Sequence, residues 1–201
     1  MATLIVLALV ITLCWKAREV ADALDMRRWS DFYPEAPTYG PAPSGPNEAA
    51  GTLPSPLTDI LARSPQRNAE TFLKGASETY ELVVTAFATG DLEPVRYLLG
   101  DELAVDFSGA IAERRQRGEK LTVTFIGLAG LDIVDGAMEG EMAWIDVRIV
   151  GQMVSVLRNG MGAVLLGDPL RVVDMPEIWT FERNMNAADP VWRLVTTEPE
   201  E

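Results

Sequence analysis

The sequence predicts an α+β domain in which three helices pack on a curved antiparallel sheet, preceded by a membrane-anchor helix and a proline-rich linker. Helical periodicity from Asn68 to Gly118 and apolar-polar alternation from Leu121 to Thr197 predict the domain. Fifteen uncharged residues at the N-terminus predict the anchor. We therefore divide the 201 residues into an anchor (1–15), a juxtamembrane segment with the linker (16–67) and the domain (68–198).

Three helical patterns follow one another at the start of the domain. Asn68 can cap the first, and Gly90 stands where a helix commonly ends. Asp91 opens a short second pattern, and Asp101 opens a third that ends in arginines before Gly118, as the helix dipole prefers. The three apolar faces hold Phe72, Ala76, Tyr80, Val83 and Phe87, then Leu92, Val95 and Leu99, then Leu103, Phe107, Ala110 and Ile111.

The strands follow the helices. We expect two strands at 121–125 and 131–138, and a Glu139-Gly140 turn into a long third strand. In that strand Ala143, Ile145, Val147 and Ile149 share one face, and Met142, Trp144, Asp146 and Arg148 share the other. Gly151 indicates a bulge or bend, because the alternation becomes irregular there.

The rest of the sheet is predicted from turns and short apolar runs. Asn159-Gly160 indicates a hairpin, residues 164–166 pair briefly, 178–183 form a strand, and 191–197 form the last strand after the Asp189-Pro190 turn. A long, bent sheet would wrap the first helix and enclose a cone-shaped cavity. The candidate lining residues of that cavity are Phe72, Ala76, Tyr80, Phe107, Trp144, Trp179 and Phe181.

The N-terminal run is interpreted as an uncleaved membrane anchor. Fifteen helical residues rise about 22 Å against a hydrocarbon core of about 30 Å, a shortfall that bilayer thinning and snorkelling of Lys16 and Arg18 would cover. The alternatives are a cleaved secretory signal, which usually has a basic start, and a core helix, which usually has a polar face. The anchor residues are Leu4, Ile5, Val6, Leu7, Leu9, Val10, Ile11, Leu13 and Trp15.

Basic residues follow the run and none precede it, so the positive-inside rule places the N-terminus outside and the domain in the cytoplasm. Residues 16–32 are either an interfacial helix or a short solvated one. Residues 34–65 hold eight prolines and are expected to form an extended spacer. Within it, Leu53, Leu57, Ile60 and Leu61 indicate either a short helix that docks on the domain or a linear motif for a partner.

Composition excludes several classes of site. The chain has no histidine and one cysteine, Cys14, so Ser-His-Asp and Cys-His arrangements, histidine metal sites and an intrachain disulfide are excluded. The net charge is -13, and residues 69–201 carry 11 basic and 23 acidic side chains. A nucleic-acid partner needs a basic surface and is not expected, whereas a basic protein partner or simple solubility fits the acidic domain.

No catalytic, cofactor or metal residue can be named from the sequence. Asp132, Asp135, Asp146 and Asp174 are scattered and share no motif, so we expect solvated acids and a protein without enzymatic activity. Trp144, Trp179 and Trp192 are expected in the core rather than in a ligand cage. An acid beside a tyrosine in the cavity would favour an enzyme, but neither Tyr80 nor Tyr97 has a visible partner.

Five segments carry a family resemblance that covers about two thirds of the chain. They are Phe72-Leu73-Lys74-Gly75-Ala76 with Tyr80-Glu81, the run from Ala86 to Leu92, Ile111-Ala112-Glu113-Arg114 with Gly118-Glu119, Trp179-Thr180-Phe181-Glu182-Arg183, and the run from Asp189 to Leu194. Together they resemble the Tim44-like domain family, and the anchor with its linker looks like the bacterial membrane-anchored members. Met175-Pro176 departs from the pattern and would displace the start of its strand or make it an edge.

The resemblance implies a fold similar to the nuclear-transport-factor-2-like (NTF2-like) cone. Mitochondrial members tether an Hsp70 chaperone at the protein import channel of the inner membrane. Together with the single-pass, N-out anchor derived above, it implies a non-enzymatic adaptor of the bacterial inner membrane, without a cofactor. Its domain would bind a protein partner, such as an Hsp70-type chaperone or a membrane protein complex, or membrane lipid, in protein translocation or membrane-protein quality control. The alternative is an NTF2-like small-molecule-binding protein or enzyme that uses the cavity.

Overall fold

The computed structural model describes residues 55–200, so the predicted anchor and most of the predicted linker lie outside the described residues. None of the helices in this described part is long and apolar enough to cross a membrane. The helical elements come first: α2 (Ser55–Arg63), α3 (Ala69–Thr89), the 3₁₀ helix η2 (Glu93–Leu98) and α4 (Asp101–Gln116). The strands follow: β1 (Lys120–Glu139), β2 (Met142–Arg158), β3 (Val164–Gly167), β4 (Val173–Asn184) and β5 (Arg193–Pro199).

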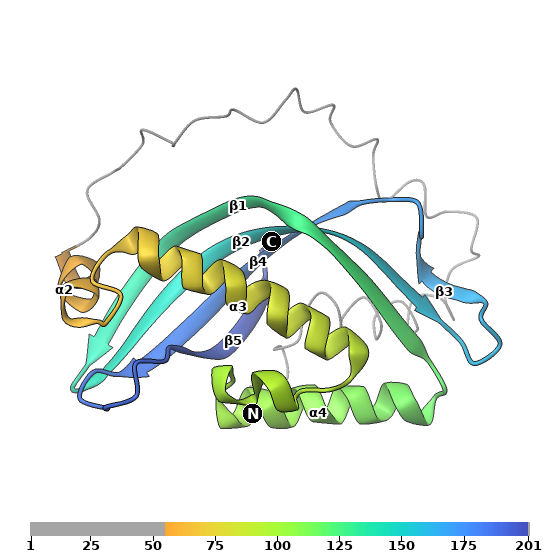
Figure 1. The fold of residues 1–201 in the computed structure, drawn as a ribbon, viewed down its shortest axis with the longest axis horizontal. Coiled ribbons are helices and arrows are strands. Elements are labelled where there is room, and N and C mark those ends of the chain that lie inside the picture. Colours follow the sequence, from red (N-terminus) through yellow and green to blue (C-terminus); the bar gives the residue numbers. More distant parts are fainter. Residues whose placement is uncertain (1–54, 201) are drawn as a thin grey trace.

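The strands form one antiparallel sheet in the order β1-β2-β4-β5, and β3 pairs with the end of β2. Figure 1 shows the long strands arching over α3, with α4 below it. The core fills the space between α3 and the concave face of the sheet. The fold is therefore α+β with helices packed on an antiparallel sheet, as the sequence predicts.

The helix ends lie where the sequence places them. The Asn68 side chain accepts a hydrogen bond of 2.8 Å from the Thr71 amide, and Gly90 closes α3 in the left-handed conformation with φ of 80°. The second pattern forms a 3₁₀ helix rather than an α-helix, because it has only six residues and a proline in its first turn. Of the two interpretations of the apolar cluster in the linker, the helix that docks on the domain is the one observed. Residues 55–63 form α2, and Leu57, Ile60 and Leu61 are buried in the core.

The prediction of two strands at 121–125 and 131–138 is wrong, because both belong to the single strand β1 of 20 residues. The pairing of β1 with β2 shifts register between Phe125 and Gly127, between Leu128 and Gly130, and between Ile133 and Asp135. Each bulge adds a residue that interrupts the alternation without ending the pairing. The bulges also bend the strand, which lets the sheet curve around α3.

The face predicted for the third strand is confirmed, because Ala143, Ile145, Val147 and Ile149 of β2 are fully buried. Gly151 lies opposite the β1 bulges. α3 comes so close to β2 at this position that there is no room for a side chain. A Cβ atom at Gly151 would lie 2.2 Å from the Tyr80 hydroxyl oxygen. The glycine therefore permits the close approach of a buried tyrosine, while the bulged residues belong to β1.

The remaining strands follow the predicted order. The hairpin between β2 and β3 is closed by the Asn159 amide, which donates to the Ala163 carbonyl at 2.9 Å. β4 begins at Val173, so Pro176 does not displace its start. β5 ends at Pro199, which lies opposite Glu177. Residues 173–176 of β4 therefore have no partner strand on that edge, and a proline is tolerated there.

Arg114 joins α4 to the end of α3. It is buried, and its Nη2 donates to the carbonyls of Phe87 at 2.7 Å and Ala88 at 3.1 Å, while its guanidinium lies 5.0 Å from the centre of the Phe87 ring. These carbonyls belong to the last turn of α3, where no intrahelical donor remains. The arginine therefore acts as a cap supplied by another helix.

Arg114→Met is expected to lower the free energy of unfolding by about 2 kcal/mol, because it leaves two buried carbonyls without this donor. Urea unfolding of residues 55–201, followed by circular dichroism, measures the change. Arg115→Met is the control: Arg115 also donates to a helix-end carbonyl, that of Gly90 at 2.7 Å, but it is exposed to solvent. Equal losses in the two variants would contradict the assigned role of Arg114.

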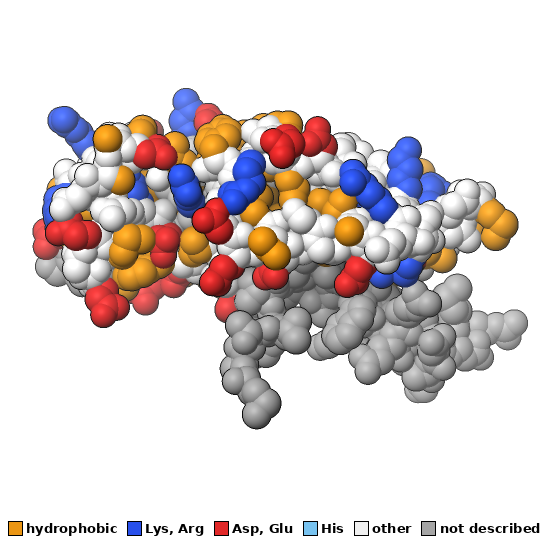
Figure 2. Space-filling model, turned by 90° about the horizontal axis from the view of Figure 1, so that it is seen from below, with side chains coloured by type: hydrophobic (Ala, Val, Ile, Leu, Met, Phe, Trp, Pro, Cys, Tyr) orange, Lys and Arg blue, Asp and Glu red, His pale blue; other side chains and the backbone are white. Residues whose placement is uncertain are grey.

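Charge is unevenly distributed over the face seen in Figure 2. In that view, the end that carries β3 shows Lys, Arg and hydrophobic side chains, whereas over the rest of the face Asp and Glu side chains are mixed with Lys, Arg and hydrophobic ones. The domain is acidic as a whole, so this end differs from its surroundings.

Candidate functional site: a groove beside helix α3

A groove of about 430 Å³ lies between α3, η2 and the segment that leads into β5. Its floor is aromatic: Phe72 makes edge-to-face contacts with Phe181 and Trp192, with ring centres 5.8 and 5.3 Å apart. All three rings are buried, and the Trp192 indole nitrogen donates to the Gln66 side chain at 3.1 Å. The floor is therefore held in place without a ligand.

The rim of the groove is partly open to solvent. Leu82 of α3 is 49% exposed and Tyr97 of η2 is 56% exposed, although both are large apolar side chains. Gly75 of α3 also lines the groove, with no atom within 4 Å of the position its Cβ would take. The remaining lining residues are Gln66, Thr71, Lys74, Ala76, Glu78, Thr79, Leu98, Pro190 and Val191. The groove thus combines an apolar floor with a rim of both charges.

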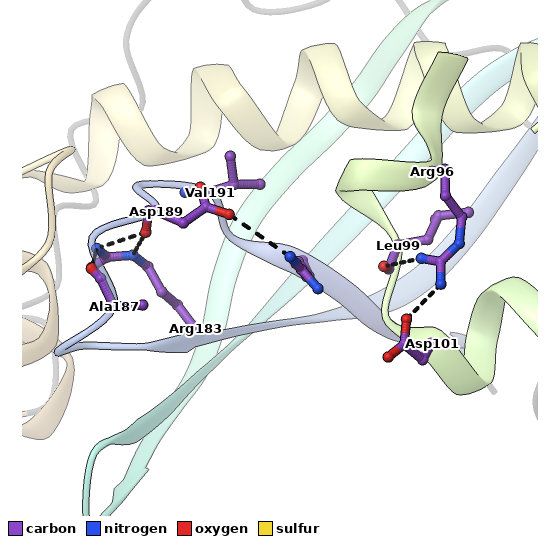
Figure 3. A network of polar contacts seen from close by, with 8 residues as sticks. Arg96, Leu99, Asp101, Arg183, Ala187, Asp189 and Val191 are labelled. Atoms are coloured by element: carbon purple, nitrogen blue, oxygen red, sulfur yellow. Dashed lines mark hydrogen bonds and ion pairs between the residues drawn. The ribbon is translucent and has the colours of Figure 1, made fainter. Parts of the chain in front are cut away.

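Two arginine networks fix the segments that carry this rim (Figure 3). Arg183 of β4 donates to the Asp189 carbonyl at 3.1 Å, and the Asp189 side chain accepts from the Val191 amide at 3.0 Å. These bonds set the turn that presents Val191 and Trp192. On the other side, Arg96 donates to the Leu99 carbonyl and pairs with Asp101, which joins η2 to the start of α4.

The predicted cavity residues separate into three groups. Phe72, Ala76 and Phe181 line the groove. Tyr80, Phe107 and Trp179 are buried in the core and do not line it. Trp144 lies on the opposite face of β2 from Ala143 and Ile145, where its indole nitrogen donates to Glu182 at 2.8 Å. The cavity assignment of Trp144 is corrected accordingly, because the inward face of β2 belongs to the odd-numbered residues.

The main charged group that sequence reasoning missed is Glu177 of β4. Its carboxyl is buried and accepts a hydrogen bond of 3.0 Å from the Tyr80 hydroxyl, so the expectation that Tyr80 has no partner is wrong. Burial raises the pKa of Glu177 from 4.5 to about 7, while the Tyr80 hydrogen bond opposes the rise. The Trp179 indole N–H is close enough to oppose it too, although the two groups form no hydrogen bond of standard geometry.

Burial also raises the pKa of the Tyr80 hydroxyl well above its usual range, and the nearby Glu177 adds to the rise. Neither Tyr80 nor Glu177 lines the groove. The pair joins α3 to β4 inside the core.

The four aspartates examined in the sequence lie outside the groove. Asp135 and Asp146 are register partners on β1 and β2, and Asp132 is opposite Arg148, so three of them are closer together than the sequence indicates. Asp146 is on the face of β2 that points away from the core. Within residues 55–200, no group of three or more acidic or cysteine side chains could hold a metal ion.

Comparison with known proteins gives one family and a few relatives. The family model described as Tim44-like domain matches residues 55–199. The human mitochondrial import inner membrane translocase subunit TIM44 is 25% identical over 142 residues, which are 69% of this chain and 31% of that protein. The rat protein of the same name is 23% identical over the same length. This chain spans about a third of the length of these relatives.

A search of solved structures finds the intermembrane space region of the chloroplast protein ARC6, with a TM-score of 0.44 and 12% identity. The alignment covers 63% of this chain and 95% of that one. The family match, by contrast, covers most of the chain and all of the elements from α2 to β5. The chain therefore belongs to the Tim44-like domain family.

Proposed function

We propose that the chain is a non-enzymatic adaptor, tethered to the bacterial inner membrane by residues 1–15, whose domain binds a protein partner in the groove beside α3. The adaptor would act in protein translocation or membrane-protein quality control. Its partner would be an Hsp70-type chaperone or a membrane protein complex. The observation that carries the proposal is the groove itself, an open surface with a preformed apolar floor and a rim of both charges.

The chemistry of the groove fits a peptide segment with one or two apolar side chains. Because Phe72, Phe181 and Trp192 already pack together, binding would not require the floor to be ordered. Lys74 and Glu78 stand on the same helix at the rim and could orient a peptide by its charges. The excess of acidic residues in the domain favours a partner with basic residues near the bound segment.

The tether would supply local concentration. Residues 16–54 could reach at most ~130 Å if fully extended, at roughly 3.4 Å per residue. The domain would therefore meet cytoplasmic partners in a thin shell along the membrane, where its effective concentration is high. The N-out, C-in topology is part of this proposal.

Filling the groove is expected to abolish partner binding. Gly75 lines the groove and has open space at its Cβ position, so Gly75→Leu adds a large side chain there. It should also stabilise α3 by about 0.8 kcal/mol, because leucine is a better helix former. Gly109→Leu is the matched control, since Gly109 of α4 is equally free of contacts and lies outside the groove. Proteins captured from solubilised membranes with the tagged chain would be identified and quantified by mass spectrometry.

We expect Gly75→Leu to reduce capture of the specific partner by about tenfold or more, and Gly109→Leu to leave it unchanged. Capture of the same abundant proteins at equal levels by the wild type and both variants would contradict the proposal. Loss of binding in both variants would place the binding surface elsewhere on the helices.

The second candidate function is an NTF2-like small-molecule-binding protein or enzyme. The buried Tyr80–Glu177 pair favours it, because an acid with a raised pKa beside a hydroxyl is typical of acid-base sites. Tyr80→Phe distinguishes the two functions. It would abolish turnover or ligand binding in an enzyme of this kind, and it would leave partner capture through the groove intact.

A further inference from the structure

Residues 155–172, here called the arm, comprise the end of β2, β3 and the loop to β4. The arm holds five of the ten exposed large apolar side chains among the described residues, although it is only 18 residues long. Met161 and Leu170 are 91% and 94% exposed, and Val164, Leu165 and Val172 are each more than 40% exposed. Figure 1 shows β3 and its hairpin at one end of the molecule, away from α3.

Defined turns fix the backbone that carries these side chains. The Asn159 side chain accepts from the amides of Met161 and Ala163 at 3.0 Å each, and the Asp168 side chain accepts from the Leu170 amide at 2.8 Å. Val156 and Leu157 pair with β3. The arm thus presents Met161 and Leu170 on a built scaffold, and neither side chain contributes to the core.

The charge of the arm is opposite to that of the whole chain. Its charged residues are Arg158, Asp168 and Arg171, and Lys120 of β1 is the register partner of Arg158. The arm with Lys120 therefore carries a net charge of about +2, whereas the whole chain carries -13. Figure 2 shows Lys, Arg and hydrophobic side chains together at this end of the molecule.

We propose that the arm inserts its apolar tip into the surface of an anionic lipid bilayer. The inference rests on the proposed function in one respect, since the anchor would keep the domain near such a surface. Anionic headgroups attract the basic residues and repel the acidic remainder of the domain, which orients the arm towards the membrane. Met161 and Leu170 then enter the boundary between headgroups and acyl chains, and Lys120 and Arg158 remain at headgroup level.

Shape and charge favour lipid over another protein. The described tip projects from the body, and a bilayer deforms around such a projection, whereas a stable protein interface needs about 800 Å² of complementary surface on each partner. A second copy is disfavoured because each chain carries -13 and like charges repel.

The test uses the full chain inserted through its own anchor into vesicles of equal parts phosphatidylglycerol and phosphatidylethanolamine. In a Cys14→Ala background, an environment-sensitive fluorophore is attached at Met161→Cys or at the control position Val105→Cys. Val105 is also highly exposed, at 70%, but lies on α4. Nitroxide-labelled lipids should quench the fluorophore at residue 161 at least ~threefold more than at residue 105, because quenching requires contact with the bilayer.

The preference for residue 161 should disappear in phosphatidylcholine vesicles and in the Leu170→Ser variant, whose side chain makes no core contact. Equal quenching at residues 161 and 105 in anionic vesicles would overturn the proposal. A blue shift at residue 161 that appears without lipid and grows with protein concentration at fixed detergent concentration would also overturn it, and would indicate a second copy on the arm. A shift that requires added membrane proteins would indicate a protein partner, with the same consequence.

The outcome is separable from that of the proposed function. Flotation of the chain with the vesicles reports the anchor, quenching at residue 161 reports the arm, and capture that Gly75→Leu abolishes reports the groove. Failure of the arm alone leaves the anchor and groove results unchanged, and failure of the groove leaves the quenching unchanged.

Discussion

Gly151→Ala is expected to destabilise the domain by about 3 kcal/mol, although it adds a single methyl group. The added Cβ would lie 2.2 Å from the Tyr80 hydroxyl oxygen and 2.6 and 2.7 Å from the Cε1 and Cζ atoms of its ring. Tyr80 cannot withdraw, because it is fully buried, contacts the rings of Phe125 and Trp179, and donates to Glu177. α3 would have to move away from the sheet.

Urea unfolding of residues 55–201 measures this change, and Gly127→Ala is the control. Gly127 lies on β1 with no atom within 4 Å of its Cβ position, so alanine there should be neutral or stabilise the strand by up to about 1 kcal/mol. Tyr80→Phe should rescue Gly151→Ala only in part, because it removes the hydroxyl and keeps the ring. Equal effects of the two glycine substitutions would show that α3 does not approach β2 as described.

The second large effect is on the pH dependence of stability, through Glu177. Its pKa is about 7 in the folded domain and 4.5 without burial, so the folded state retains a proton that the unfolded state loses between these values. The contribution of Glu177 to the free energy of unfolding is therefore greatest below pH 4.5 and falls as the pH rises to about 7. Above pH 7 it no longer changes with pH. The total loss is on the order of 3 kcal/mol.

Glu177→Gln isolates this contribution, because the amide keeps an acceptor for the Tyr80 hydroxyl and does not titrate. The free energy of unfolding of the wild type, minus that of the variant, should fall by about 3 kcal/mol from pH 4.5 to pH 7. Other carboxylates act equally on both proteins and cancel in the difference. A difference that stays constant over this range would mean that Glu177 is solvated in the folded protein.

The helices and the inner strand could be predicted from the sequence because their signals are local. Asn68 and Gly90 bound a full apolar stripe, and the alternation from Ala143 to Ile149 is uninterrupted. The length of β1 could not be predicted, because its bulges near Gly127 and Asp135 shift the alternation. For Leu57, Ile60 and Leu61, the sequence indicated an apolar cluster and left open whether it folds onto the domain.

The site was predicted only in part, because its residues come from segments that tertiary packing brings together. Phe72, Ala76 and Phe181 follow from helix and strand periodicity. Tyr97 comes from a 3₁₀ helix, which has no period that reveals a face. Trp192 lies in the segment just before β5, and the strand predicted at 191–197 begins too early to show where its side chain packs. Glu177 had a usable signal, since it alternates with Met175, Trp179 and Phe181 on the inward face of β4. A polar residue in such a series indicates a buried partner.

The central claim is that the groove binds a protein partner at the membrane, and site-specific photocrosslinking in intact cells tests it most directly. A photoreactive amino acid replaces either Tyr97 at the rim of the groove or Val105 on α4, two positions that are both exposed. We predict that residue 97 crosslinks to one membrane-associated protein at least about tenfold more than residue 105 does, and that Gly75→Leu removes the product. Identical products from both positions, or a product at residue 97 that Gly75→Leu leaves unchanged, would contradict the account.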